Sequence, residues 1–172
     1  STLGIMAVVV ALLMVGGEFD LSAGVMTAST SLVTAILATQ AGWNVWLALF
    51  ASLVFALGVG AFNGWLVMKT GLPSFIVTLG SFLALQGLNL GVTRLVTNTV
   101  QVSGMRSTSG YESAGGLFAS TFDIGGTEFQ SSIVWWIVVT AIAAWLLVRT
   151  RFGNWIFAVG GSQVSARSVG VP

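Results

Sequence analysis

Five long runs of apolar residues, none of which contains a charged residue, constrain this chain more than any other feature. They are Leu3–Val15, Leu21–Ala38, Val45–Met68, Pro73–Val92 and Ile133–Val148. A helix of about 20 residues crosses the ~30 Å hydrocarbon core of a bilayer, and the first run, at about 20 Å, is short of that thickness. Of the 172 residues 55% are hydrophobic and 6% charged, against about 25% charged in soluble domains. The sequence predicts an all-α, polytopic transmembrane helix bundle with about five membrane-spanning segments.

Composition also excludes several classes of function. The net charge of +1 gives no basic field for nucleic acid, and the sequence contains neither Cys nor His. Without those residues there is no Ser-His or Cys-His catalysis and no common zinc site. No Walker A loop is present to hold ATP phosphates. We therefore expect no enzyme, no catalytic or metal-binding residues and no nucleic-acid partner, with membrane lipid as the surroundings.

The basic residues predict an orientation in the membrane. Four of them follow the third and fifth runs: Lys69, Arg149, Arg151 and Arg167. Because cytoplasmic loops are enriched in Lys and Arg, these residues are expected in the cytoplasm. The Glu18–Asp20 turn then lies on the same side, whereas the Asn44 turn and the polar segment 97–130 are external. The predicted domains are a transmembrane bundle over residues 1–148, with the external loop 97–130, and a cytoplasmic segment over residues 149–172.

Small residues recur at four-residue spacing within two of the runs. They are Ala56, Gly60 and Gly64 in the third run and Gly87 and Gly91 in the fourth. Such rows let helix backbones approach closely in membranes. We expect these glycines to be packing positions between helices.

An acidic turn between the first two runs is the first candidate for function. Glu18, Asp20 and Ser22 lie in the sequence Gly17–Gly24. In one interpretation Asp20 or Ser22 caps the second helix. In the other the carboxylates form a proton or cation relay, because charges near the membrane interior are commonly functional.

Uncharged polar residues inside the third and fourth runs are the second candidate. They are Asn63, Thr78, Gln86 and Asn89. They either join helices through hydrogen bonds, at ~0.6 kcal/mol each, or line a path for a hydrophilic solute. Gln86 and Asn89 are three residues apart and share one helix face.

The polar tail is the third candidate. Ser162 can cap a short helix, Gly170 can adopt the left-handed conformation that ends one, and Pro172 blocks its continuation. A helix of about 10 Å is too short to be stable alone. It therefore docks on a partner protein or lies on lipid headgroups. The polarity of residues 162–168 favours the protein partner.

Three blocks together resemble a known family. Gly17–Gly24 resembles the Gly-x-x-Asp-Leu-Ser-x-Gly signature of ribose- and xylose-type sugar ABC transporter permeases, the inner-membrane components of binding-protein-dependent transport systems. Asn63-Gly64 with Gly71–Gly80 is similar to the next block of that family. The cytoplasmic coupling loop is matched by three stretches, Thr150–Gly153, Ala158–Gly161 and Ala166–Gly170. Two departures stand out: Gln86 replaces the Arg of many members, and Gln163-Val164-Ser165 replaces a more acidic stretch.

The resemblance implies a multi-pass permease subunit of a bacterial sugar importer in the inner membrane. Two permease subunits, identical or different, would form the pathway, and a periplasmic sugar-binding protein would deliver the solute. Separate ATP-binding cassette ATPase subunits would bind the ATP, so no cofactor is expected in this chain. The ATPase would dock on a coupling helix near Ser162–Val169, with six contact residues: Ser162, Gln163, Ser165, Ala166, Arg167 and Val169.

Two other classes of function compete with this interpretation. The alternative is an ion-coupled secondary transporter, in which Glu18 and Asp20 are the coupling groups. An intramembrane enzyme is the weaker rival, because no Ser-Lys pair is evident. The family's first helix and last several helices have no counterpart here, so we expect a fragment of one larger permease domain.

Overall fold

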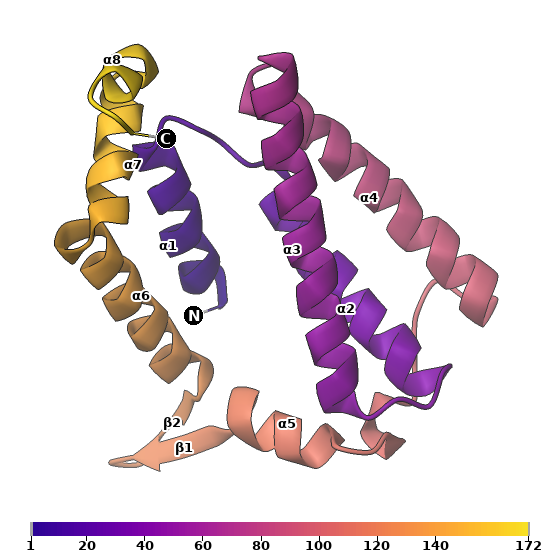
Figure 1. The fold of residues 1–172 in the computed structure, drawn as a ribbon. Helices are drawn as coiled ribbons and strands as arrows, with labels where there is room; N and C mark the ends of the chain where they lie inside the picture. The colour runs from indigo at the N-terminus through magenta and orange to yellow at the C-terminus, as the bar shows by residue number, and fades with distance from the viewer. Residues whose placement is uncertain (1, 172) are drawn as a thin grey trace. The chain divides into compact units, whose positions relative to one another are not determined.

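The computed structural model describes residues 2–171, which form eight α-helices, one 3₁₀ helix and one β-hairpin. These elements divide into two compact units (Figure 1). Unit 1 consists of Ser1–Asp20 and Phe118–Pro172, and unit 2 consists of Leu21–Leu117.

Unit 2 consists of three long apolar helices followed by two short helices. Its elements are α2 (Ser22–Thr39), α3 (Val45–Thr70), α4 (Ser74–Thr97), the 3₁₀ helix η1 (Met105–Ser107) and α5 (Tyr111–Phe118). Helix α2 packs against both α3 and α4. The side chain of Asn44 accepts a hydrogen bond from the Trp46 amide and so caps α3. Gly71 ends α3 in the left-handed conformation, at φ 67°.

A small hydrophobic core lies at one end of unit 2. It consists of Ala38, Val45, Ala48 and Ala114, from α2, α3 and α5. The Val45 amide donates to the Ser109 carbonyl at 2.9 Å, and Trp46 Nε1 donates to Ser113 Oγ at 2.9 Å. The turn at residue 44 and the segment after α4 therefore meet at the same end, which agrees with placing both on one side of the membrane.

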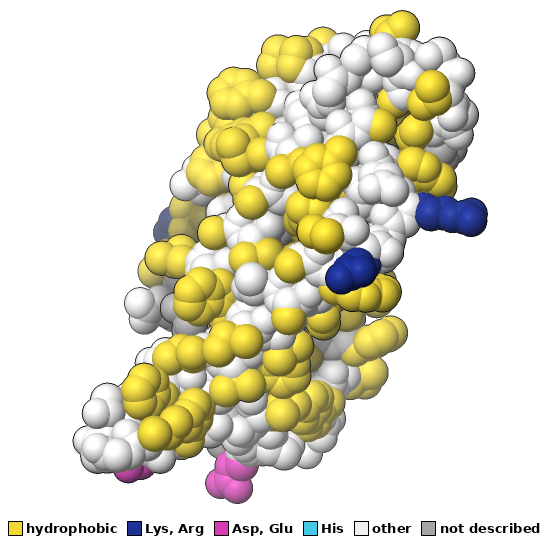
Figure 2. All heavy atoms as spheres, turned by 90° about the vertical axis from the view of Figure 1, so that its left-hand side faces the viewer, with side chains coloured by type: hydrophobic (Ala, Val, Ile, Leu, Met, Phe, Trp, Pro, Cys, Tyr) yellow, Lys and Arg dark blue, Asp and Glu magenta, His cyan; other side chains and the backbone are white. Residues whose placement is uncertain are grey.

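Unit 1 contains both ends of the chain. Its elements are α1 (Thr2–Val15), β1 (Thr121–Ile124), β2 (Thr127–Gln130), α6 (Ser132–Arg149), α7 (Arg151–Gly161) and α8 (Gln163–Ser168). The strands form an antiparallel hairpin in which Phe122 faces Phe129. Helix α1 packs against α6 and α7 (Figure 1). In Figure 2 hydrophobic side chains are spread over the whole face toward the viewer, with acidic side chains at its lower end and basic side chains near its middle.

The predicted helical membrane fold is confirmed. Helices α2, α3, α4 and α6 are long and apolar enough to cross a membrane, with windows of mean hydropathy from 1.3 to 2.3. Many apolar side chains of α3, α4 and α6 are exposed, as lipid contact requires, whereas those of α2 are mostly half-buried. Helix α1 has 14 residues, about 21 Å, and is short as its apolar run predicted. The prediction missed α7 and ended the fourth helix about one turn too early.

The packing role predicted for the spaced glycines is wrong within this chain. A Cβ atom added at Gly60, Gly64, Gly87 or Gly91 would meet no atom within 4 Å. Their faces of α3 and α4 are open because α2 packs elsewhere on both helices. The crowded helical glycines of the described part of the chain are Gly4 in α1 and Gly153 and Gly160 in α7.

Candidate functional site

The segment Gly17–Gly24 joins the two units. Helix α1 ends in a Schellman motif, in which Gly17 N donates to the Met14 carbonyl and Glu18 N donates to the Leu13 carbonyl. This motif needs the left-handed conformation that Gly17 adopts, at φ +85°. Four residues after Gly17 the chain passes into unit 2, and α2 begins at Ser22. The acidic turn therefore starts at the capped end of α1, in unit 1, and ends at the start of α2, in unit 2.

Glu18 is held by the tail of the chain. Its Oε1 accepts a hydrogen bond from Gln163 Nε2 at 3.2 Å, across 145 residues of sequence. Glu18 is only partly buried. Glu18 and Gln163 were both predicted on the cytoplasmic side, and this contact agrees with placing them together.

A buried polar cluster joins the three helices of unit 2. Asn63 Nδ2 donates to Ser22 Oγ at 3.1 Å, and Ser81 Oγ donates to Asn63 Oδ1 at 2.5 Å. Ser22 is 1% exposed and Asn63 4%. One amide thus bonds to α2 on one side and to α4 on the other, which fixes the arrangement of three helices.

The start of α2 differs from the predicted cap. Leu21, rather than Asp20 or Ser22, occupies the N-cap position, and its side chain makes no capping bond. The backbone amide of Leu21 donates to Thr78 Oγ1 at 3.1 Å, and Ser22 Oγ accepts from Asn63. Helix α4 therefore supplies a hydroxyl for an amide next to the helix start, where a local side chain was expected.

The four predicted pathway residues do not form one cluster. Asn63 and Thr78 are buried and bonded within the polar cluster. Gln86 is exposed and Asn89 is half-buried on α4. Sequence analysis missed Ser81, although its spacing of three residues from Thr78 would have placed both on one helix face.

The predicted short helix in the tail is present and is capped at both ends. Ser162 Oγ accepts from the Ser165 amide at 3.2 Å, as predicted for an N-cap. At the other end Val171 N donates to the Ala166 carbonyl and Gly170 N to the Arg167 carbonyl. Gly170 has φ +86°, so this is a second Schellman motif. The two caps satisfy backbone groups that a six-residue helix would otherwise leave unpaired.

The faces of α8 differ sharply in exposure. Ala166 is 2% exposed and packs within the chain, so its side chain is not available to a partner. Val164 and Val169 are 81% and 78% exposed, and Arg167 is also exposed. The exposed apolar side chains of α8 are therefore those of Val164 and Val169.

Thr150 forms the joint between α6 and α7. Its Oγ1 donates to the Leu146 carbonyl at 2.5 Å and accepts from the Gly153 amide at 3.2 Å. Its extended backbone, at φ −118° and ψ 157°, separates the two helices by one residue. One hydroxyl thus serves the end of one helix and the start of the next, a role that the sequence pattern did not indicate.

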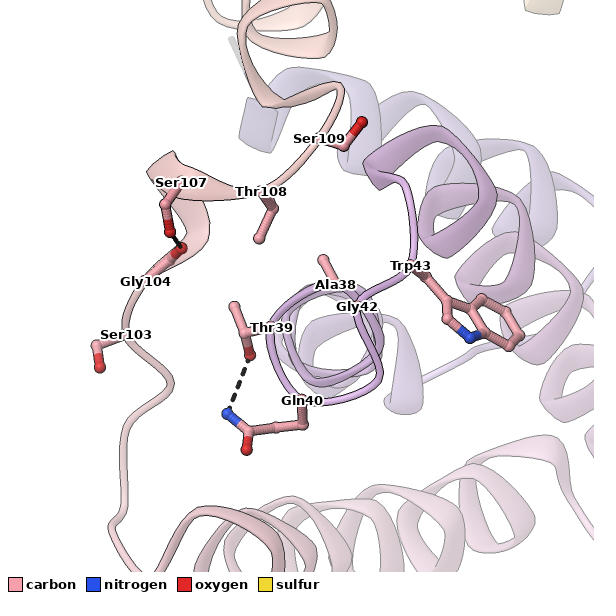
Figure 3. A pocket seen from close by; sticks show the side chains of 10 residues that line it. All are labelled: Ala38, Thr39, Gln40, Gly42, Trp43, Ser103, Gly104, Ser107, Thr108 and Ser109. Atoms are coloured by element: carbon pink, nitrogen blue, oxygen red, sulfur yellow. Dashed lines mark hydrogen bonds between the residues drawn. The ribbon is translucent and has the colours of Figure 1, made fainter.

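A polar pocket of about 380 Å³ lies at the far end of α2 in unit 2 (Figure 3). Three of its hydroxyl groups donate to nearby backbone: Thr39 to the Ala35 carbonyl, Thr108 to the Met105 carbonyl and Ser107 to the Gly104 carbonyl. The ring of Trp43 points away from the space between α2 and η1 (Figure 3). Because these three hydroxyl protons are already bonded, we assign the pocket no substrate.

No group of three or more acidic, His or Cys side chains that could hold a metal ion occurs among residues 2–171. The candidate sites are therefore the acidic turn and the capped helix α8 in unit 1 and the polar cluster in unit 2. In each of them hydrogen bonds hold helix ends or helices together.

Comparison with known proteins places these features in context. The family model described as branched-chain amino acid transport system / permease component matches residues 1–172. The ribose import permease protein RbsC of Escherichia coli (strain K12) is 33% identical over an alignment of 173 positions that covers 99% of this chain and 50% of the relative. The xylose transport system permease protein XylH of the same strain is 30% identical, over 98% of this chain and 55% of the relative.

A third relative comes from another organism. The autoinducer 2 import system permease protein LsrD of Klebsiella pneumoniae subsp. pneumoniae is 31% identical over 96% of this chain and 47% of the relative. The chain thus spans about half the length of these relatives. No solved structure matches it.

Proposed function

This chain belongs to the permease-component family of branched-chain amino acid transport systems, and we propose that it serves a bacterial importer of a monosaccharide or a related small polar solute. The chain is a multi-pass inner-membrane protein. In the proposal it supplies membrane helices to the pathway and the helix on which an ATPase docks. Relatives named for ribose and xylose import support a sugar as the solute, in preference to an amino acid.

The observation that carries this proposal is α8. A six-residue helix gains too little from its own hydrogen bonds to persist in water. This one has an N-cap, a Schellman motif and a buried Ala166, and it presents Val164 and Val169 outward. A short, capped helix that exposes two valine side chains at the end of a membrane domain is suited to bind in a groove of a partner protein.

The other parts of the importer follow from the same proposal. The ATPase subunits bind ATP, so this chain needs no cofactor and catalyses no reaction. A second permease subunit completes the pathway, and a periplasmic binding protein delivers the solute. Residues 149–172 form the cytoplasmic segment, and residues 1–148 form the membrane part with the loop 97–130 outside.

The predicted site residues take different roles in the proposal. Asn63 and Thr78 hold helices together, because their polar groups already have partners inside unit 2. Gln86 and Asn89 remain the candidates for a polar lining on α4. Glu18 holds the tail through Gln163, which favours a joint over the ion-coupling role of the alternative carrier.

Reconstituted transport tests the proposal. The full-length protein that contains this chain is co-expressed with the ATPase and binding protein encoded beside it and placed in liposomes. We expect uptake of labelled ribose or xylose that requires both ATP and the binding protein. Uptake driven by a proton or sodium gradient without ATP would establish the carrier instead, and uptake of leucine alone would overturn the solute class.

The docking surface has its own test. Val164→Glu places a charge on the most exposed apolar side chain of α8, so we expect loss of ATPase pull-down with normal membrane levels. Val164→Ile, which keeps an uncharged apolar side chain at the same exposed position, is the matched control. Pull-down that survives Val164→Glu would show that the ATPase docks elsewhere. Ala166→Glu is a poorer test, because its buried position makes it disrupt the helix itself.

A further inference from the structure

Helix α7 packs through two glycines on one face. Gly153 and Gly160 are seven residues apart, which is two helical turns. A Cβ atom added at Gly160 would overlap the carbonyl oxygen of Val15, at the end of α1. A Cβ added at Gly153 would overlap the carbonyl of Leu147, near the end of α6. Each glycine therefore lies against the carboxyl end of another helix.

Both carbonyls lie in the last turn of a helix, where the helix itself supplies no amide to bond them. In α1 the Schellman motif uses the carbonyls of Leu13 and Met14, and the next carbonyl, that of Val15, faces Gly160. In α6 the Thr150 hydroxyl takes the carbonyl of Leu146, and that of Leu147 faces Gly153. Only a hydrogen atom fits between, so each contact brings a Cα–H group against a carbonyl oxygen.

These contacts join backbone to backbone. A flexible side chain can move aside when a neighbour shifts, but two helix backbones in contact must move together. Gly17 adds to the same seam, because a Cβ there would lie 3.6 Å from the Gly160 Cα. At Gly160 the helices α1 and α7 thus meet backbone to backbone.

The seam continues into α8. Gln163, the first residue of α8, donates to Glu18 at 3.2 Å, just past the end of α1. Only Ser162 separates α7 from α8, and its hydroxyl caps α8. The links from α8 to the end of α1 are therefore the capping bond of Ser162, the backbone contact of Gly160 and one side-chain hydrogen bond between Gln163 and Glu18.

We propose that α1, α7 and α8 move as one rigid body, in which Gly153 and Gly160 are positioning residues. Displacement of α8 is then delivered to the carboxyl end of α1 and to the acidic turn that follows it. This inference rests on the proposed function, since it takes α8 as the place where the ATPase acts. It assigns α1 as the membrane helix that receives the movement.

A reversible cross-link tests the rigid body. The chain contains no Cys, and a Cβ added at Gly16, next to the end of α1, would lie 3.7 Å from the side chain of Ile156 in α7. Gly16→Cys with Ile156→Cys therefore provides one thiol pair, which a short bifunctional methanethiosulfonate reagent bridges. If α1 and α7 never separate, the cross-linked full-length complex imports sugar at the rate measured before cross-linking. Loss of import that a reducing agent restores would overturn the proposal.

A matched glycine pair tests the positioning role. Gly160→Ala forces α7 away from the Val15 carbonyl, whereas a Cβ at the neighbouring Gly161 meets nothing within 4 Å. In complexes that assemble with the ATPase, we expect Gly160→Ala to keep ATP hydrolysis and lose solute transported per ATP. Gly161→Ala should keep both. An unchanged transport-to-hydrolysis ratio in Gly160→Ala would overturn the role of Gly160.

The two proposals fail in different ways. If the proposed function is wrong, the parental protein itself shows no ATP-dependent import and Val164→Glu still binds the ATPase. If only the rigid body is wrong, the parental protein imports normally and the cross-link abolishes that import. The cross-link therefore decides the inference independently.

Discussion

The two units hold their helices together by opposite means. In unit 1, α7 meets the ends of α1 and α6 through glycines, with no room for a methyl group. In unit 2, the helices are joined by the polar cluster of Ser22, Asn63 and Ser81, while Gly60 and Gly64 face open space. The glycine row that looks like a packing motif is the open one, and the isolated pair in α7 makes the close contacts.

The difference shows that spacing alone does not tell what a glycine does in a membrane protein. A four-residue row permits close approach, but a neighbour must be present on that face. A glycine against a carbonyl is fixed by the position of a helix end, which another part of the chain decides. The stability of unit 1 therefore depends on single glycine positions, whereas the stability of unit 2 depends on the buried amide of Asn63.

The largest expected effect is that of Gly153→Ala. The added methyl group would overlap the Leu147 carbonyl, and a backbone atom cannot rotate away. We expect a loss of about 3 kcal/mol or more in stability, seen as a lower thermal midpoint and poorer yield of detergent-purified protein. Gly161→Ala on the same helix is the control. Equal behaviour of both variants would remove the glycine seam from the comparison.

Asn63→Ala is expected to have the next largest effect. It removes the amide that bonds to Ser22 and Ser81 and leaves a small cavity in unit 2. We expect a loss of about 2 kcal/mol, measured as the thermal midpoint. Gln86→Ala, at an exposed position on α4, should change stability by less than about 0.5 kcal/mol. A similar loss for both would show that the polar cluster does not join the helices of unit 2.

Ser162→Ala should act locally on unit 1. The hydroxyl of Ser162 is the N-cap of α8, and loss of such a cap costs about 1 kcal/mol. We expect faster hydrogen exchange of the α8 amides and weaker ATPase pull-down, with the remaining helices unchanged. Ser168→Ala, in the last turn of α8, is the control. Unchanged exchange in Ser162→Ala would show that the docking of Ala166 alone holds the helix.

The smallest effect, with the opposite sign, is expected for Gly64→Ala. The added methyl group meets no neighbour in this chain, and alanine is favoured over glycine inside a helix by up to ~1 kcal/mol. We expect an equal or slightly higher thermal midpoint. A clear decrease in the purified full-length protein would show that another part of the protein covers this face of α3.

Much of the fold could be predicted because apolar runs fix membrane helices directly. The five runs correspond to α1, α2, α3, α4 and α6, with most ends placed within a few residues. Ser162 and Gly170 were correctly identified at the ends of α8, because capping depends on neighbouring residues only. Helix α7 was missed, because its exposed aromatic residues and glycines are not typical of either a membrane span or a loop.

The candidate site was predicted only in part, because its bonds link distant residues. Ser22 was expected to cap its own helix and instead accepts from Asn63, 41 residues away. Ala166 was expected to face a partner, yet it is buried. A residue's side of a short helix cannot be known until the surface on which the helix packs is known.

The sequence by itself determined that this chain crosses a membrane as several helices, where those helices begin and end, and to which family it belongs. These properties depend on residues that are near one another in the chain and on the cost of charge in lipid. Only the tertiary structure decided that Gly160 lies on the Val15 carbonyl, that Glu18 holds Gln163 and that the glycines of α3 are open. The physical reason is that the surfaces of membrane helices are all similarly apolar. Which helices pair is therefore decided by small residues and single hydrogen bonds, at contacts that the local sequence does not specify.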